Sequence, residues 1–284
     1  MLGTHPAVRA ALTAVAVLLT GCSADTSEPA GAPGTPTPSA AGTTVPAPEP
    51  ERPTEGGCYR LDLDQALAAT TDLAARDCGS PHTARTFLVG RLDRAVDGHL
   101  LAVDSARVRT QVAEECPAAL PGFVGGGTDG WRLSVLRAVW FTPSLADADA
   151  GASWFRCDVV ALDGRGGLLP LGGRLEGALD TPPGRDRWGL CATGAPDDAR
   201  AVRVPCSEEH GWRAVSVVEL PGTGAGAEDY PGEEAARQRG QGPCEQVGRE
   251  RAQDPLEFTW GYEWPSAEQW AAGQRFGRCW VPVD

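Results

Sequence analysis

Cysteine followed by histidine is the arrangement in this sequence that most directly suggests chemistry. Cys78 is followed four residues later by His82, and Cys206 is followed four residues later by His210. A free thiol beside an imidazole could act as a nucleophile with its base. An imidazole alone could be a base, a metal ligand or a pH-sensitive contact. We favour a structural interpretation, in which each imidazole caps the turn after a disulfide-bonded cysteine and donates to a backbone carbonyl.

The cysteine count favours disulfides over free thiols. The chain has nine cysteines, and Cys22 stands apart near the N-terminus. The other eight are an even number, which in a secreted protein indicates a disulfide framework. Zinc sites usually contain a Cys-x2-Cys or His-x3-His pair, and the sequence contains neither, so we predict no metal site. The disulfide candidates are Cys58, Cys78, Cys116, Cys157, Cys191, Cys206, Cys244 and Cys279.

These eight cysteines fall into two quartets with matching spacing. The second and third cysteines are 38 positions apart in both quartets, and the histidine lies 34 positions before the third cysteine in both. The fourth cysteine follows Arg156 in the first quartet and Arg278 in the second. Agreement between several independent spacings predicts an internal duplication.

Duplication reduces the pairing problem to three possibilities in each quartet. The first two cysteines of a quartet lie on short apolar segments that could pair as neighbouring strands. The third lies in a helix-like stretch, and the fourth lies at the start or end of a strand. We therefore favour first with second and third with fourth, which gives Cys58–Cys78, Cys116–Cys157, Cys191–Cys206 and Cys244–Cys279.

Other residues that could do chemistry have structural interpretations that we favour. Arg156 and Arg278 could bind an anionic polymer, but a salt-bridged position beside a strand also explains them. Glu114–Glu115 and Glu208–Glu209 could suggest the carboxylates of a glycosidase, but adjacent side chains point apart. Core packing explains the late tryptophans better than a glycan or protein surface does; they are Trp140, Trp154, Trp260, Trp264, Trp270 and Trp280.

Hydrophobic patterning predicts the elements that must position these residues. In the first unit, we expect strands at 86–89, 132–141 and 154–162, a helix at 101–116 that Pro117 ends, and a short helix at 145–150. In the second unit, we expect strands at 202–206, 214–218, 256–264 and 276–283, a helix at 233–251 interrupted by Gly240, Gly242 and Pro243, and a short helix at 266–273.

Strands beside one main helix in each unit predict an α+β fold. We expect two tandem, disulfide-stapled modules, each a small antiparallel sheet with one main helix. The first module covers residues 57–162 and the second covers residues 188–284. Residues 163–187 are rich in Gly, Pro and Leu and are predicted to be a linker, although Leu168–Leu171 could pack on a module.

The N-terminal residues predict a location outside the cytoplasm. A short charged region precedes about ten apolar residues, the pattern of a secretory signal, and Leu19-Thr20-Gly21-Cys22 resembles the lipobox of bacterial lipoproteins. That resemblance implies a signal peptide over residues 1–21 and lipidation of Cys22, which would anchor the chain to the extracytoplasmic face of the membrane. Residues 22–56, with almost no large apolar side chain, are predicted to be a disordered tether.

Composition excludes several classes of function. The net charge of the 284 residues is −13, which argues against a nucleic-acid partner. All 25 basic residues are arginine, so Schiff-base chemistry and a phosphate loop of the Walker type are excluded. The sequence contains no run of about 18 apolar residues, so we predict no membrane-spanning helix.

The motifs together resemble the septum formation family of actinobacteria. In the first unit, the resemblance rests on Gly57-Cys58-Tyr59, the segment Cys78–His82, and Arg156-Cys157. In the second unit, it rests on Val204–His210, Tyr230-Pro231-Gly232, Cys244, Pro265, Trp270–Gly273 and Arg278-Cys279. The second unit departs from the pattern at Glu209, where the family motif has proline, and the first unit lacks the Tyr-Pro-Gly segment. The resemblance implies two copies of a domain associated with cell division, and it implies no reaction.

The sequence therefore predicts a non-catalytic envelope lipoprotein that binds or scaffolds an envelope protein or cell-wall partner, without a cofactor. The main alternative is an envelope enzyme that acts on cell-wall material. A second alternative is a ligand-binding or pH-sensing module built around His82 and His210.

Overall fold

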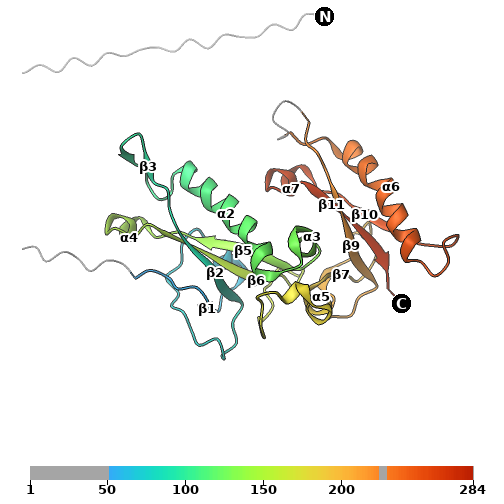
Figure 1. Cartoon of the computed structure of the whole chain (residues 1–284), viewed down its shortest axis with the longest axis horizontal. Helices are drawn as coiled ribbons and strands as arrows, with labels where there is room; N and C mark the ends of the chain where they lie inside the picture. The colour runs from blue at the N-terminus through green and yellow to red at the C-terminus, as the bar shows by residue number, and fades with distance from the viewer. Residues whose placement is uncertain (1–50, 224–228, 284) are drawn as a thin grey trace, which may run out of the picture. The chain divides into compact units, whose positions relative to one another are not determined.

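Two antiparallel sheets organise residues 51–223 and 229–283, which are the residues that this computed structural model describes (Figure 1). The first sheet has four strands in the order β1-β2-β6-β5, and every neighbouring pair is antiparallel. These strands are β1 (Cys58–Tyr59), β2 (Ala84–Arg91), β6 (Trp154–Ala161) and β5 (Leu136–Phe141). A separate small hairpin consists of β3 (Ala95–Val96) and β4 (His99–Leu100).

The second sheet has five strands in the order β10-β11-β9-β7-β8, again antiparallel throughout. They are β10 (Gly261–Glu263), β11 (Phe276–Pro282), β9 (Trp212–Glu219), β7 (Leu190–Ala192) and β8 (Arg203–Pro205). Antiparallel sheets combined with helices confirm the predicted α+β class.

One 19-residue helix packs on each sheet: α2 (Ala106–Val124) on the first and α6 (Glu233–Arg251) on the second (Figure 1). Each helix buries a stripe with a spacing of four residues, the spacing that places side chains on one face of an α-helix. The remaining helices are short: α1 (Leu63–Ala66), α3 (Gly127–Arg132), α4 (Leu145–Asp149), a 3-10 turn η1 (Ala178–Asp180), α5 (Pro182–Trp188) and α7 (Ala267–Ala271).

The two sheets are built in the same chain order. In the first, β1, β2, α2, β5, α4 and β6 follow one another, and in the second β7, β9, α6, β10, α7 and β11 do so, with β8 added at the sheet edge. The spatial order β1-β2-β6-β5 corresponds strand for strand to β7-β9-β11-β10. This correspondence supports the internal duplication, which stays a prediction.

Four disulfides connect the cysteines in the pairing favoured from the sequence. They are Cys58–Cys78, Cys116–Cys157, Cys191–Cys206 and Cys244–Cys279. Their Cα–Cα distances of 4.9–5.4 Å lie in the usual range for a disulfide. In each half, one disulfide joins the long helix to the last strand, so the helix is covalently fixed to the sheet on which it packs.

The prediction that Pro117 ends the first long helix is wrong. The helix α2 continues for seven residues beyond Pro117 and ends at Val124. An internal proline costs a helix about 3 kcal/mol or more. Continuing the helix buries Leu120 and Val124 completely, and each such side chain contributes about 1.5–3 kcal/mol. Burial of these two side chains therefore offsets much of the cost of Pro117 and of the second internal proline, Pro121.

The expected interruption of the second long helix is also wrong, because α6 runs unbroken from Glu233 to Arg251. Gly240 lies on its buried face, where an added Cβ would come within 1.9 Å of the Tyr262 ring. Glycine at this position lets the helix approach β10 closely. Gly240, one of the three residues expected to interrupt the helix, instead permits close packing.

The strand expected over residues 256–264 is present only as Gly261–Glu263, and Leu256 is 93% exposed. The register explains the difference. Gly261 pairs with Trp280, and β11 ends two residues later at Pro282, so residues 256–258 lie beyond the end of the neighbouring strand. In the first module, the expected strand 132–141 begins only at Leu136, because α3 extends to Arg132.

Residues 163–187, predicted to be a linker, belong to the core. They include η1 and most of α5, and they bury Leu171, Leu175 and Leu179. One apolar cluster contains these leucines together with side chains from both sheets, among them Leu136 of β5 and Trp280 of β11. The prediction that Leu168–Leu171 could pack on a module agrees with this arrangement. The two sheets therefore share one continuous core.

We expect Leu175→Ala to destabilise the whole molecule by about 2–5 kcal/mol, because it opens a cavity in the shared core. Both sheets should unfold in one transition, since each would lose the same core. Chemical denaturation with the disulfides intact, monitored by tryptophan fluorescence and by amide hydrogen exchange, measures the free energy of unfolding and shows whether the two sheets unfold together. Leu256→Ala is the matched control and should change stability by less than about 0.5 kcal/mol. Two separate transitions for the two sheets would contradict the shared core.

Candidate functional site

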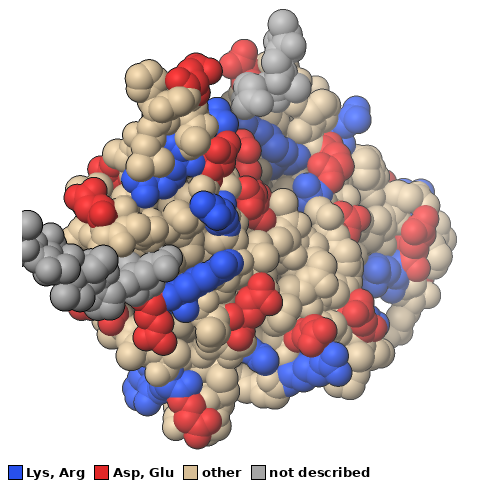
Figure 2. Space-filling model, turned by 60° about the vertical axis from the view of Figure 1, so that its left-hand side comes forward, with Lys and Arg blue, Asp and Glu red and all other residues tan. Residues whose placement is uncertain are grey.

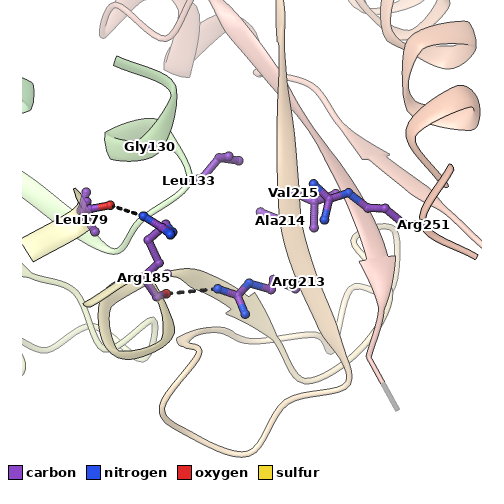
Figure 3. Close-up of a pocket in the computed structure, with 9 residues that line it drawn as sticks. Gly130, Leu133, Leu179, Arg185, Arg213, Ala214, Val215 and Arg251 are labelled. Carbon is purple, nitrogen blue, oxygen red and sulfur yellow. Dashed lines mark hydrogen bonds between the residues drawn. The ribbon is translucent and has the colours of Figure 1, made fainter. Parts of the chain in front are cut away.

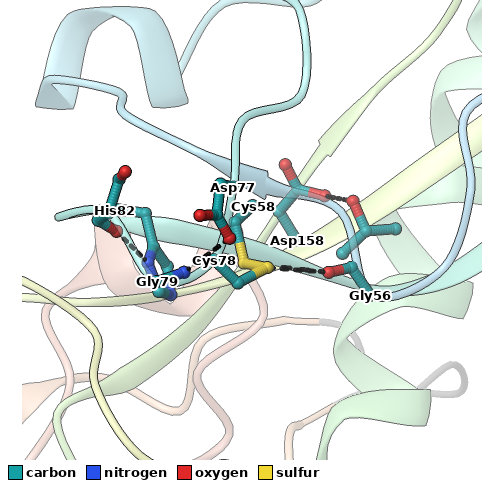
Figure 4. The surroundings of a disulfide bond; sticks show 9 residues. Gly56, Cys58, Asp77, Cys78, Gly79, His82 and Asp158 are labelled. Atoms are coloured by element: carbon teal, nitrogen blue, oxygen red, sulfur yellow. Dashed lines mark hydrogen bonds between the residues drawn. A yellow bond between two sulfur atoms is a disulfide. The ribbon is translucent and has the colours of Figure 1, made fainter.

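The two motif histidines make the same local contact. The Nδ1 atom of His82 lies 2.9 Å from the carbonyl oxygen of Ser80, and Nδ1 of His210 lies 2.7 Å from that of Glu208. A carbonyl only accepts, so Nδ1 carries the proton in both rings. His82 is buried beside the Cys58–Cys78 disulfide (Figure 4). Both imidazoles thus cap the turn after a disulfide-bonded cysteine.

One cluster of possible metal ligands lies among the described residues, formed by Cys191, Cys206 and His210. Their ligand atoms lie within 4.8 Å of one another. The two sulfur atoms are joined in a disulfide, and a metal binds the thiolate form of cysteine. When the disulfide is formed, the one remaining metal ligand of this cluster is the imidazole of His210, which already contacts the carbonyl oxygen of Glu208.

Arg156 forms a buried ion pair inside the first module. Its guanidinium lies over the Tyr59 ring, 3.7 Å from the ring centre, and 4.7 Å from the centre of the Phe141 ring. Asp158, two residues along β6, lies 3.0 Å from the guanidinium and accepts a hydrogen bond of 2.7 Å from the Thr86 hydroxyl. Arg156 is 3% exposed and Asp158 is fully buried. The pair is enclosed by the core, so it does not offer a surface to an anionic polymer.

Burial controls the titration of Asp158. Loss of solvation raises the pKa of this carboxyl from 3.8 to about 6, and the opposing attraction of Arg156 and the hydrogen bond from Thr86 do not compensate. The Arg156 nitrogen nearest Asp158 is poorly aligned for a hydrogen bond, which limits the stabilisation of the charged form.

Arg278 occupies the matching position in the second module but makes different contacts. Its Nε atom donates a hydrogen bond of 2.9 Å to the carbonyl oxygen of Arg132, in α3 of the first module. Its Nη1 atom lies 3.5 Å from Glu263 on the neighbouring strand β10. Arg278 is nearly buried, and desolvation lowers its pKa. Arg278 therefore connects the two modules. The sequence interpretation, a salt-bridged position beside a strand, did not predict this contact.

Sequence analysis missed the other charged residues at this junction. Desolvation, together with repulsion from Arg278, lowers the pKa of Arg137 to about 9, although Glu263 acts in the opposite direction. Arg137 donates to the carbonyl oxygens of Ser134 and Leu136. Glu263 also pairs with Arg203 at 3.1 Å. No sequence spacing links Arg137 to the second module, because the shared core alone brings them together.

A pocket of about 290 Å³ opens beside this junction (Figure 3). We call it the arginine pocket. Its apolar wall comes from both modules and from the segment between them, namely Leu133, Leu179, Ala214 and Val215. Its polar lining consists of Arg185 of α5, Arg213 of β9 and Arg251 at the end of α6. Among the described residues, no carboxylate lines it.

The remaining candidates do not assemble into a site. Glu114 and Glu115 are exposed on α2, and Glu115 accepts a hydrogen bond from Gln111. Trp270 and Trp280 are buried, as expected for core residues. The other late tryptophans are half-buried: Trp140, Trp154, Trp260 and Trp264.

The surface carries charges of both signs. On the face seen in Figure 2, acidic and basic side chains alternate and do not gather into a single-sign patch. A continuous cationic face, which phosphate backbones require, is not seen on that side. Within residues 51–223 and 229–283, no helix is long and apolar enough to cross a bilayer.

We expect Asp158 to make the protein less stable as the pH rises from about 5 to 7.5. The folded pKa of about 6 exceeds the unfolded value of 3.8, so the folded state holds a proton in this interval that the unfolded state has lost. Linkage then lowers the free energy of unfolding by roughly 1 kcal/mol over this range.

The measurement is urea denaturation of the wild type and Asp158→Asn at both pH values. Other carboxyls titrate equally in both proteins, so the change in the difference between them isolates Asp158. Between pH 5 and pH 7.5, the free energy of unfolding of the wild type should fall by roughly 1 kcal/mol relative to that of Asp158→Asn, because only the wild type has this titrating carboxyl. An unchanged difference between the two proteins, or a change in the opposite direction, would contradict the raised pKa.

Comparison with known proteins identifies a family but no individual relative. No curated protein matches the chain, and no solved structure matches it. A family model described as Septum formation matches residues 55–279, more than half of the chain. This single match spans both modules and the segment between them, so the expectation of two tandem family domains stays a prediction. The chain belongs to the septum formation family.

Proposed function

We propose that the protein is a non-catalytic lipoprotein of the cell envelope that binds or scaffolds partners during septum formation. Membership of the septum formation family supports a role related to cell division. Four disulfides are typical of a protein outside the cytoplasm, because they persist in an oxidising environment.

The observation that carries this proposal is the union of two disulfide-stapled sheets through one core. A core shared in this way fixes the position of one module's surface relative to that of the other. Fixed surfaces suit a protein that presents several contact areas at once, since less conformational freedom is lost on binding.

The state of the cysteines supports a role without catalysis. All eight cysteines among the described residues are cross-linked, so neither Cys78 nor Cys206 provides a thiolate for attack. The imidazoles that could have served as bases are directed to backbone carbonyls through Nδ1. An enzyme that uses a cysteine nucleophile and a histidine base therefore has less support than a binding role.

The anchor in this proposal is Cys22, which lies outside the described residues, as do the signal peptide and most of the tether over residues 22–56. Lipid on Cys22 would hold the folded part at the outer face of the membrane. Two or more acyl chains give stable anchoring, because each buried methylene adds about 0.8 kcal/mol. The tether would let the body reach partners away from the bilayer.

We expect a C-terminal fusion of the full chain to a fluorescent protein that folds outside the cytoplasm to form a band at division sites. The band should fade when division is blocked. A fusion of residues 1–56 alone to the same reporter is the control and should label the cell periphery evenly, because it lacks the folded body. An even peripheral signal from the full chain would overturn the septal role.

We also expect Cys22→Ala to release the protein from the membrane fraction, since it removes the lipidated thiol. Fractionation of cells followed by mass spectrometry of the N-terminal peptide measures both location and acylation. Cys22 is not one of the eight disulfide-bonded cysteines, so the disulfide map of the variant should be unchanged. An unmodified Cys22 in the wild type would refute the anchor and leave the septal experiment unaffected.

A further inference from the structure

The arginine pocket gathers positive charge in a protein that is strongly acidic as a whole. Arg185, Arg213 and Arg251 line a volume of about 290 Å³, whereas the net charge of the chain is −13. The three residues come from three different elements, α5, β9 and α6. Their convergence depends on the tertiary fold and not on a basic run in the sequence.

The partners of these arginines leave positive charge available. Arg185 donates to the Leu179 carbonyl at 2.8 Å, and Arg213 donates to the Arg185 carbonyl at 3.3 Å, as Figure 3 shows. Carbonyls satisfy hydrogen bonds without neutralising charge. One carboxylate, the exposed Asp186, pairs with Arg213 at 3.0 Å. Arg251 makes no hydrogen bond or ion pair with the residues that the structure describes, although it also lines a second pocket together with Asp254 and Glu257. Among the described residues, Asp186 is therefore the one carboxylate paired with the three guanidinium groups.

Contacts with the fold hold the wall of the pocket and two of its arginines in place, although Arg185 and Arg251 are themselves exposed. Its wall includes Leu179 and Ala214, both members of the shared core. The guanidinium of Arg185 is held against the backbone of η1, and that of Arg213 against the backbone of α5. Pre-positioned donors lose less conformational freedom when a ligand binds. In Figure 3 the side chain of Arg251 reaches from the end of α6 toward Val215 of β9.

We propose that the arginine pocket binds a phosphate group. A carboxylate has one charge and two acceptor oxygens, whereas a phosphate monoester carries a charge of about −1.5 to −2 and three terminal oxygens. Arginine presents planar pairs of donors that match such oxygens. The excess of about two positive charges and the three donor groups fit a phosphate better than a carboxylate. The apolar wall would contact the carbon chain that carries it.

A phosphate of this kind could come from two sources outside the cytoplasm, namely a phospholipid whose headgroup is a phosphate monoester, as in phosphatidic acid, or a soluble phosphate monoester. The shared chemistry is the terminal phosphate, and the experiment separates the sources. Nucleic acid is not a candidate, because the net charge of −13 would repel a long phosphate backbone.

The first measurement is a titration of the full chain, with disulfides intact, with inorganic phosphate at low ionic strength. Nuclear magnetic resonance of the arginine Nε–H groups and of the Ala214 and Val215 amides reports binding at the pocket itself. We expect saturable shifts at these positions and much weaker binding of acetate. Linear shifts without saturation, or acetate bound as tightly as phosphate, would overturn the proposal.

Variants locate the binding. Arg213→Gln and Arg251→Gln should each weaken phosphate binding by at least roughly tenfold, as expected for loss of a charge-assisted hydrogen bond. Arg239→Gln is the matched control, because Arg239 is exposed on the same helix as Arg251 and lies outside the pocket. Equal weakening in all three variants would mean non-specific attraction and would refute the site.

The second measurement identifies the source. The wild type is mixed with vesicles of equal parts phosphatidic acid and phosphatidylcholine, and separately titrated with glycerol 3-phosphate. Vesicles with phosphatidylglycerol in place of phosphatidic acid are the control, because their phosphodiester carries one charge and no terminal phosphate. Arg251-dependent retention on vesicles assigns the headgroup, and Arg251-dependent binding of glycerol 3-phosphate assigns a soluble ester. Either result supports the pocket, and neither overturns it. This test is independent of septal localisation, so each proposal can fail alone.

Discussion

The apolar core shared by the two sheets is the interaction on which the rest of the structure depends. Leucines from residues 163–187 fill the space between β5 and β6 on one side and β7, β9 and β11 on the other. Each sheet alone would leave this apolar face in water, and small modules bury too little surface to tolerate that loss easily. The segment that joins the modules in sequence therefore also supplies the side chains that join them in space.

The shared core explains why arginines collect where the modules meet. Arg132, Arg137, Arg203 and Arg278 lie around Glu263 and Glu219. Burying charge is unfavourable unless it is paired, and here several guanidinium groups instead donate to backbone carbonyls or lie over aromatic rings. A planar, delocalised cation is suited to both contacts. A lysine at these positions would lose the stacking and most of the donors.

Local signals in the sequence predicted the parts of the fold that local physics determines. Matching cysteine spacing led to the disulfide pairing, and turn-capping of His82 follows from its place after Cys78. Predictions failed where tertiary packing overrides local preference. Pro117 stays inside a helix because the following leucine and valine are buried, and a Gly/Pro-rich segment becomes core because both sheets need its leucines. The role of Arg137 was not predictable, since it depends on a contact between modules.

The disulfides and the shared core constrain different elements of the structure, and together they determine the geometry of the arginine pocket. Cys244–Cys279 fixes α6 to β11 within the second module, and so limits where the end of that helix, with Arg251, can lie. The core positions α5, with Arg185, against the same sheet. A covalent bond alone could not set the distance between α5 and α6, because no disulfide links them. The geometry of the pocket is therefore a property of the united modules, and separation of the two sheets would remove it even with every disulfide intact.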